Sequence, residues 1–350
     1  MILRMPEYCR SFRCIADKCK DNCCIGWEID IDSLTAEYYE NVKGAFGEKL
    51  KENIEKGEGA SFKLKDERCP FLNSCNLCEI IINLGEDRLC QICSDHPRYF
   101  EWYSSIKEGG IGLCCEEAAR LIVNSAERFS VYETACDDEG YDDYNEELYD
   151  MFFFVREEII SLLEAESLTL KERIESALSY AAEIQSLADN YIFSKVPAKR
   201  QNIQVKDKAD VKSFMKSFEN LEAIDNNWKN YLYELIESAD ALEKKLALYN
   251  GEFDLYLKNI AVYFIWRYFL KGVYDEEIFS KVMLMAVSVA MIKLMYLKDF
   301  DSGKNSKDFF SDTAKNYSKE IEYSEENLEK IYDMVYENPA FAADNVIPII

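Results

Sequence analysis

The fold class is decided by residues 148–163, which read LYDMFFFVREEIISLL. Apolar side chains recur there at steps of three and four residues, the spacing that places them on one face of an α-helix. Similar spacing fills residues 174–193, 211–248, 253–270, 278–297 and 328–336. The sequence therefore predicts a mainly α protein whose C-terminal part, residues 148–350, is an α-helical array.

Residues 133–147, ETACDDEGYDDYNEE, precede this array with eight acidic side chains and no basic one. Like charges in series repel and keep a chain solvated, so we predict an acidic linker there. Residues 1–132 form the cysteine-rich region, in which we expect little strand. A short strand is predicted at 27–31 by alternation, and a helix at 34–42 with Ser33 as its N-cap. Another helix is predicted from Cys114 to about Phe129.

The composition limits the classes of function. The formal net charge is −25, which argues against nucleic acid as a partner because phosphates would be repelled. Residues 282–297 are apolar but short for a membrane span and include Lys293, so a buried core helix is expected rather than a membrane contact. Residues 1–12 lack the apolar stretch of a secretion signal, and we expect a cytoplasmic protein.

All thirteen cysteines lie at or before Cys136, and the only histidine, His96, lies among them. They form a first group at Cys14, Cys19, Cys23 and Cys24, a second at Cys69, Cys75, Cys78, Cys90 and Cys93, and a Cys114–Cys115 pair. A CxxC unit places two thiolates where they can grip one metal ion or an iron–sulfur cluster. In a reducing cytosol such a density favours metal binding over disulfides.

The spacing leaves the metal open between zinc and an iron–sulfur cluster. The two CxxC units resemble a tight zinc ribbon, whereas a cluster could take ligands from all three groups. The Cys-x3-Cys-x2-Cys spacing of radical enzymes is absent, as is any glycine-rich nucleotide loop. His96 could be a ligand, a proton donor or part of a turn, and Arg98 could anchor a carboxylate or cluster sulfides. Nearby aromatic residues are expected to coat the site: Trp27, Tyr99, Phe100, Trp102 and Tyr103.

Read in order, these motifs resemble one family. The series is Cys19-x3-Cys23-Cys24, Cys69-Pro-Phe-Leu, Leu77-Cys78-Glu79-Ile80, Cys90-x2-Cys93-x2-His96-Pro-Arg98 and Cys114-Cys115-Glu116. It resembles the flagellin lysine-N-methylase (FliB-type) family, which is similar to the YkgJ-type cysteine-cluster proteins. The resemblance covers about residues 8–120 and leaves the helical remainder without a diagnostic motif.

The resemblance implies transfer of a methyl group from S-adenosylmethionine to lysine side chains of flagellin, dependent on a [4Fe–4S] cluster. The expected metal ligands are Cys19, Cys23, Cys69, Cys78, Cys90 and Cys93, with zinc as the alternative metal. The lysine ammonium must lose its proton before it can attack, and the candidate acceptors are Glu79, Glu116 and Glu117. Arg98 and His96 are the candidate cofactor-binding residues. Two alternatives remain, a non-catalytic zinc-binding interaction module and an iron–sulfur redox or sensor protein.

Overall fold

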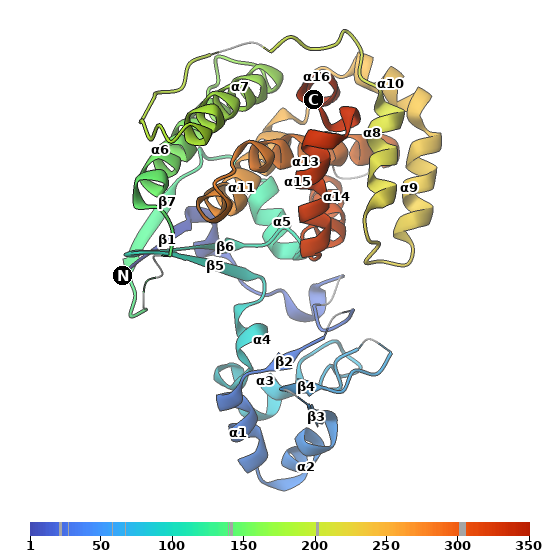
Figure 1. Ribbon diagram of the computed structural model, residues 1–350. Coiled ribbons are helices and arrows are strands. Elements are labelled where there is room, and N and C mark those ends of the chain that lie inside the picture. Colours follow the sequence, from blue (N-terminus) through green and yellow to red (C-terminus); the bar gives the residue numbers. More distant parts are fainter. Residues whose placement is uncertain are drawn as a thin grey trace.

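The computed structural model describes residues 1–350 except 21–22, 27, 58, 67, 139, 141–142, 201–202 and 301–305. Two bodies of secondary structure are visible in Figure 1, a large helical array and a smaller lobe beside it. Each has its own hydrophobic core, and Cys90 belongs to the core of the smaller lobe. The mainly α fold class is confirmed. The division at residues 133–147 stays a prediction. The chain leaves the large core after Phe12 and packs against it again from Tyr99 onward.

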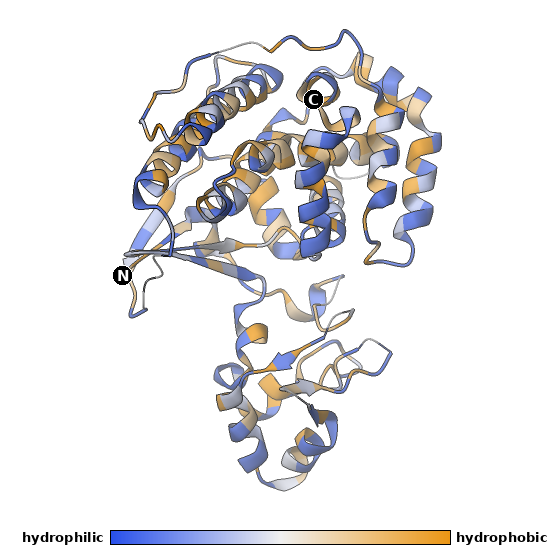
Figure 2. Cartoon of the chain, viewed as in Figure 1, coloured by the Kyte–Doolittle hydropathy of each residue, from blue (hydrophilic) through white to orange (hydrophobic). Residues whose placement is uncertain are grey.

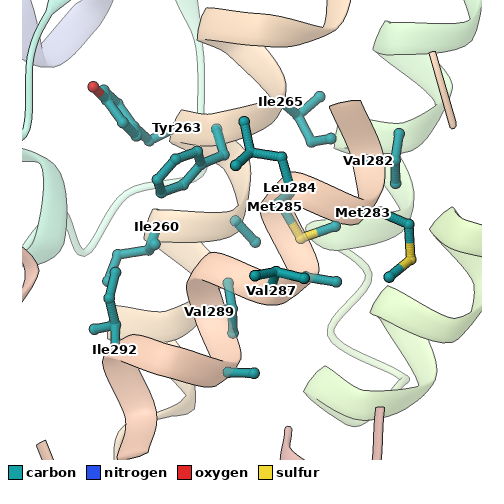
Figure 3. Close-up of a cluster of buried hydrophobic side chains, with 14 of the residues drawn as sticks. Ile260, Tyr263, Ile265, Val282, Met283, Leu284, Met285, Val287, Val289 and Ile292 are labelled. Carbon is teal, nitrogen blue, oxygen red and sulfur yellow. The ribbon is translucent and has the colours of Figure 1, made fainter. Parts of the chain in front are cut away.

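The helical array is built around two apolar helices, α11 (Asp254–Tyr268) and α13 (Phe279–Asp299). Figure 3 shows their side chains interdigitating, with Ile260 and Ile265 from α11 and Val287 from α13 among them. The other members of the array are α6 (Glu146–Leu163), α7 (Leu170–Asp189), α8 (Val211–Ser217), α9 (Trp228–Glu237), α10 (Ala239–Leu248), α12 (Gly272–Asp275), α14 (Ser306–Ile321), α15 (Glu325–Glu337) and α16 (Ala343–Val346). Several outer helices carry both hydrophilic and hydrophobic residues, as the colours of Figure 2 show.

Helix α13 is enclosed by the rest of the array, and α7, α10, α14 and α15 all contact it. Among the described residues it is the helix that is long and apolar enough to cross a membrane, by length and composition alone. Of its most apolar window, 94% is buried inside the protein. The expected core helix is therefore confirmed.

A four-stranded sheet with the order β5-β6-β1-β7 joins the two ends of the cysteine-rich region to the helical array. Its strands are β1 (Ile2–Pro6), β5 (Arg98–Tyr103), β6 (Ile106–Ile111) and β7 (Val131–Ala135). Strand β1 runs parallel to β6 and antiparallel to β7. Its Arg4 meets Glu108 of β6 at 2.6 Å, and Arg156 of α6 meets the same carboxylate at 2.8 Å. The sheet is thus fixed to the array by a buried ionic group.

The smaller lobe contains a three-stranded sheet and four helices. The strands are β2 (Asp30–Ile31), β3 (Ile54–Lys56) and β4 (Ala60–Phe62), in the order β2-β4-β3. The helices are α1 (Ser33–Asn41), α2 (Gly44–Asn53), α3 (Glu79–Leu84) and α4 (Gln91–Asp95). The core of the lobe contains Tyr39, Phe62 and Phe71, together with Cys69 and Cys90.

Some local predictions need correction. The N-cap of α1 is Asp32 rather than Ser33, because the Asp32 carboxylate accepts a hydrogen bond from the Thr35 amide at 2.9 Å. The helix expected to reach Phe129 is α5 (Glu116–Val123), which ends six residues earlier. The segment expected at 27–31 forms a strand only at Asp30–Ile31, and Trp27 lies outside the described residues. The start of the predicted linker pairs with β1 as the end of β7.

Candidate functional site

Six cysteines of the smaller lobe form one cluster of interacting thiols, which we call the thiol cluster: Cys23, Cys24, Cys69, Cys78, Cys90 and Cys93. Five of them belong to the predicted ligand set. Cys24, which was not predicted as a ligand, joins them, whereas Cys19 lies elsewhere. Cys69 and Cys90 are 6% and 0% exposed, so the cluster reaches into the core of the lobe.

Backbone hydrogen bonds bring these distant segments together. The Cys69 amide donates to the Cys24 carbonyl at 2.9 Å, which ties the first cysteine group to the second. Leu72 and Cys78 form a β-bridge. The Cys93 amide donates to the Cys90 carbonyl at 3.0 Å in the first turn of α4, so both thiols of this CxxC unit project from one turn.

Asp32 fixes the position of α4. One carboxylate oxygen caps α1, and the other accepts a hydrogen bond from the Gln91 amide at 2.9 Å, at the first residue of α4. Although burial opposes ionisation, the bonds from Gln91 and Thr35 lower the pKa of Asp32. A single carboxylate therefore holds the α4 cysteines beside the start of α1.

The thiols perturb one another electrostatically. A hydrogen bond between Cys90 and Cys93 lowers the pKa of Cys90 and raises that of Cys93. A hydrogen bond with Cys23, reinforced by burial, raises the pKa of Cys24, and burial raises the pKa of Cys69 to about 11. Several thiolates at such close range repel one another, and a bound cation would relieve that repulsion while releasing protons.

The thiols of the thiol cluster are the right type of ligand for a thiophilic metal, but they are not arranged around a common point. Thiolates are the ligands that zinc and iron–sulfur clusters take. Within the described ranges, however, no three His, Cys, Asp or Glu side chains are arranged to hold one metal ion as they stand. Metal binding by the thiol cluster is therefore a proposal.

A second group of cysteines contains Cys114 and Cys115, just before α5, and Cys19, which interacts with Cys115. The segment that carries Cys19 is tied to α5, because the Lys20 amide donates to Glu116 Oε2 at 2.7 Å. Tyr323 forms a hydrogen bond with Cys114 and also interacts with Cys23. Cys23 therefore lies between the two groups, at the junction of the smaller lobe and the helical array.

Beside Cys114 lies a buried ionic group that the sequence reasoning missed. Arg267 of α11 pairs with Glu322, which follows α14, at 2.9 Å. Glu322 Oε2 also accepts hydrogen bonds from the hydroxyls of Tyr263 at 2.8 Å and Tyr268 at 2.7 Å. The Leu113 amide donates to the Tyr263 hydroxyl at 3.2 Å, which connects this group to the backbone before Cys114. In the sequence, the sign of this ionic group is the single arginine inside the apolar run AVYFIWRYFL at 261–270.

The structure gives each predicted proton acceptor a partner within the chain. Glu79 pairs with Lys49, and Glu116 accepts from the Lys20 amide. Glu117 is 8% exposed and binds Arg120 through both oxygens, at 2.6 and 2.7 Å. Glu116 is the one that adjoins both Cys115 and the Cys19 segment. Their catalytic roles stay predictions.

The predicted cofactor-binding residues, His96 and Arg98, lie at the end of α4 and the start of β5. Burial lowers the pKa of His96 to about 4, so its imidazole is neutral at physiological pH and retains a lone pair. The Arg98 guanidinium lies over the ring of Phe12 at 5.1 Å and interacts with Cys9 of the large core. Neither role is established by these positions.

The aromatic residues after His96 belong mainly to the sheet. The ring of Tyr103 stacks on those of Tyr149 and Tyr274. The Lys107 ammonium lies over the rings of Phe100 and Trp102. Tyr99 is the exception, because its ring lies 4.6 Å from the Arg267 guanidinium. Gly112 lets the backbone approach closely: a Cβ there would lie 3.1 Å from Cys114 Sγ and 3.2 Å from Arg267 Nη1.

Comparison with known families decides the affiliation. A model of the FliB lysine N-methylase C-terminal domain matches residues 156–348, more than half of the chain. The chain belongs to the FliB lysine N-methylase family. The FliB match covers α11 and the segment with Glu322, and thus includes the Arg267 group but not the thiol cluster.

Individual relatives of this chain support its membership of the FliB family. The flagellar biosynthetic protein FliU of Salmonella muenchen is 29% identical over 139 residues, which is 37% of this chain and 80% of FliU. A lysine-N-methylase of Salmonella typhimurium is 28% identical over 139 residues, 37% of this chain and 34% of that enzyme. The alignment thus spans about a third of the length of the lysine-N-methylase. No solved structure matches the chain.

Proposed function

We propose that this protein is a lysine N-methyltransferase that moves the methyl group of S-adenosylmethionine to lysine side chains of flagellin. Membership of the FliB lysine N-methylase family carries the reaction class. The flagellar name of one relative supports flagellin as the substrate. The thiol cluster at the junction with the helical array supports a metal-dependent site there.

The reaction requires a neutral lysine amine. Its nitrogen lone pair attacks the methyl carbon, so a nitrogen–carbon bond forms, the carbon–sulfur bond breaks and the electron pair stays on sulfur as S-adenosylhomocysteine. The amine's extra proton must pass to a base before or after attack. Among the candidate acceptors, Glu116 is favoured because it adjoins Cys115 and, within the described residues, forms no salt bridge within 4.0 Å, unlike Glu79 and Glu117.

The thiol cluster supplies the ligands in this proposal. Cys23, Cys69, Cys78, Cys90 and Cys93 are retained from the expected set, and Cys24 is added. A [4Fe–4S] cluster bound there would supply Lewis-acidic iron, and zinc is the alternative metal. Burial of Cys69 and Cys90 would keep the bound group away from water.

The charge of the chain suits a basic substrate in the cytoplasm. With a formal net charge of −25, the protein attracts lysine-bearing segments from a distance and repels nucleic acid. This steering should weaken with added salt because the Debye length shortens.

The experiment is a transfer assay with anaerobically purified protein, S-adenosylmethionine and flagellin. We expect S-adenosylhomocysteine to form in step with flagellin lysines that gain the mass of one methylene group. Flagellin whose lysines have been acetylated is the control and should not react. Iron-loaded protein that yields neither product would favour a redox or sensor protein, and a colourless protein with only zinc would favour an interaction module.

A further inference from the structure

Arg267 is fixed along one edge of its guanidinium. Its Nη1 donates to the Tyr263 hydroxyl and pairs with Glu322 Oε2. The ring of Tyr99 lies at 4.6 Å and that of Tyr268 at 5.2 Å from its central carbon. The side chain is therefore held in one orientation by α11, β5 and the segment after α14.

The other edge of the guanidinium is free. Within the part of the chain that the structure describes, Nε and Nη2 of Arg267 have no hydrogen-bond or ionic partner. The side chain is 18% exposed, whereas its counter-ion Glu322 is 1% exposed. Two parallel N–H groups on one edge match the two oxygens of a carboxylate.

The pairing with Glu322 uses one end of the guanidinium. Arginine–carboxylate pairs are frequently bidentate, with two N–H groups against two carboxylate oxygens. Here the contact runs from Nη1 to Oε2, and Glu322 Oε1 is buried with no partner among the described residues. Glu322 thus orients Arg267 without occupying its bidentate edge.

The guanidinium lies close to Cys114, and its Nη1 end makes this approach. The Cβ position of Gly112 is 3.2 Å from Arg267 Nη1 and 3.1 Å from Cys114 Sγ, so the guanidinium and the thiol flank one point. The buried hydroxyl of Tyr99, whose ring packs on this guanidinium, also has no partner within the described ranges. The Arg267 guanidinium, the Tyr99 hydroxyl and the Cys114 thiol therefore all belong to the junction between the smaller lobe and the helical array.

We propose that Arg267 binds the carboxylate of a small amino-acid-like ligand at this junction, which is the methionine end of the methyl donor. The inference rests on the proposed function for the identity of the ligand and deepens it by assigning a residue to its carboxylate. It replaces Arg98 as the anchor, because Arg98 lies over Phe12 rather than beside Cys114.

The test measures binding without catalysis. Dissociation constants are determined by calorimetry for S-adenosylhomocysteine and for S-adenosyl-3-thiopropylamine, which lacks only the carboxylate. We expect the wild-type protein to bind the first compound about 10- to 100-fold more tightly, the range of a charged hydrogen-bonded pair. Arg267→Lys, which keeps the charge but loses the fork, should lose most of this preference and bind the second compound as before.

The matched control is Arg10→Gln, since Arg10 also stacks on a tyrosine (Tyr132, 3.8 Å) and pairs with a glutamate (Glu7, 2.9 Å). It should keep the wild-type preference. Equal preference in wild type and Arg267→Lys would overturn the inference, as would a wild-type protein that binds both compounds equally or neither. Arg267-dependent binding without methyl transfer would instead contradict the proposed function alone.

Discussion

At the scale of single residues, position in the fold separates the cysteines of the thiol cluster from the others. Cys78 and Cys90 lie in the thiol cluster, and Cys90 is 0% exposed. Cys136 follows β7, where its amide donates to the Met1 carbonyl at 3.1 Å. We expect the cysteines of the thiol cluster to bind metal and Cys136, which lies outside it, not to.

Serine substitutions test this directly. Cys78→Ser and Cys90→Ser each remove a soft ligand from the cluster and should lower the metal content of the purified protein. Cys136→Ser is the matched control and should leave it unchanged. Metal content is measured by elemental analysis, and equal values in all three variants would show that the cluster does not hold the metal.

Lys293 provides a pH-dependent prediction unrelated to the site. Its side chain is 4% exposed on α13, lies 3.8 Å from the ring of Tyr249 and donates to the Ile350 carbonyl. Burial lowers the pKa of Lys293 to about 8. The unfolded chain, with a lysine pKa of about 10.4, therefore binds more protons between these values, and stability rises with pH there.

We expect the free energy of unfolding of the wild-type protein to gain about 2 kcal/mol between pH 7 and pH 10 relative to Lys293→Met. Urea unfolding at several pH values measures the difference. A difference between the two proteins that stays constant over this range would mean that Lys293 titrates normally in the folded state.

The metal-ligand roles stay predictions, but spacing predicted the local geometry of one CxxC unit. Both members of the CxxC at Cys90 and Cys93 project from one turn, as their spacing requires, and both joined the cluster. Spacing cannot say on which side of a turn a cysteine lies, so Cys24 was left out and Cys19 was included. Arg267 was missed because its partner Glu322 is fifty-five positions away and only tertiary packing brings them together.

At the scale of elements, Asp32 links two helices of the smaller lobe. Asp32→Ala removes the caps of both α1 and α4 and should lower the stability of the lobe by about 1–2 kcal/mol. Because α4 carries Cys90 and Cys93, metal content should fall as well. Asp30→Ala, at an exposed position two residues earlier, is the control and should change stability by less than about 0.5 kcal/mol.

Thermal unfolding and elemental analysis together check the role of Asp32. Similar melting temperatures and similar metal contents for Asp32→Ala and Asp30→Ala would contradict it. Loss of metal without loss of stability would show that Asp32 acts on the α4 cysteines alone.

Elements with a strong local pattern were predictable, and those that depend on distant pairing were not. Residues 148–163 lie within α6 and residues 278–297 largely within α13, because helical periodicity is a local property. Strand β1 pairs in parallel with β6, about one hundred residues away, and no short-range pattern encodes that register. The predicted N-cap Ser33 was wrong by one residue because Asp32 is also a strong cap.

At the scale of the whole molecule, the cysteine-rich region leaves the large core and returns to it. Strand β1 and strands β5 to β7 are built into the large core, while the intervening chain forms a lobe with its own core. Cys23 and the Cys114–Cys115 pair meet where the two bodies adjoin. Composition alone predicts chemistry in the N-terminal third, and the helical array contributes Arg267, Glu322 and Tyr323 at the edge of that region.

We propose that the thiol cluster holds an iron–sulfur group on which lysine methylation depends. The most direct measurement is the metal content and absorption spectrum of the anaerobically purified protein. We predict about four irons per chain and broad absorption at about 400 nm. A colourless protein that contains stoichiometric zinc, or no metal, would contradict the claim.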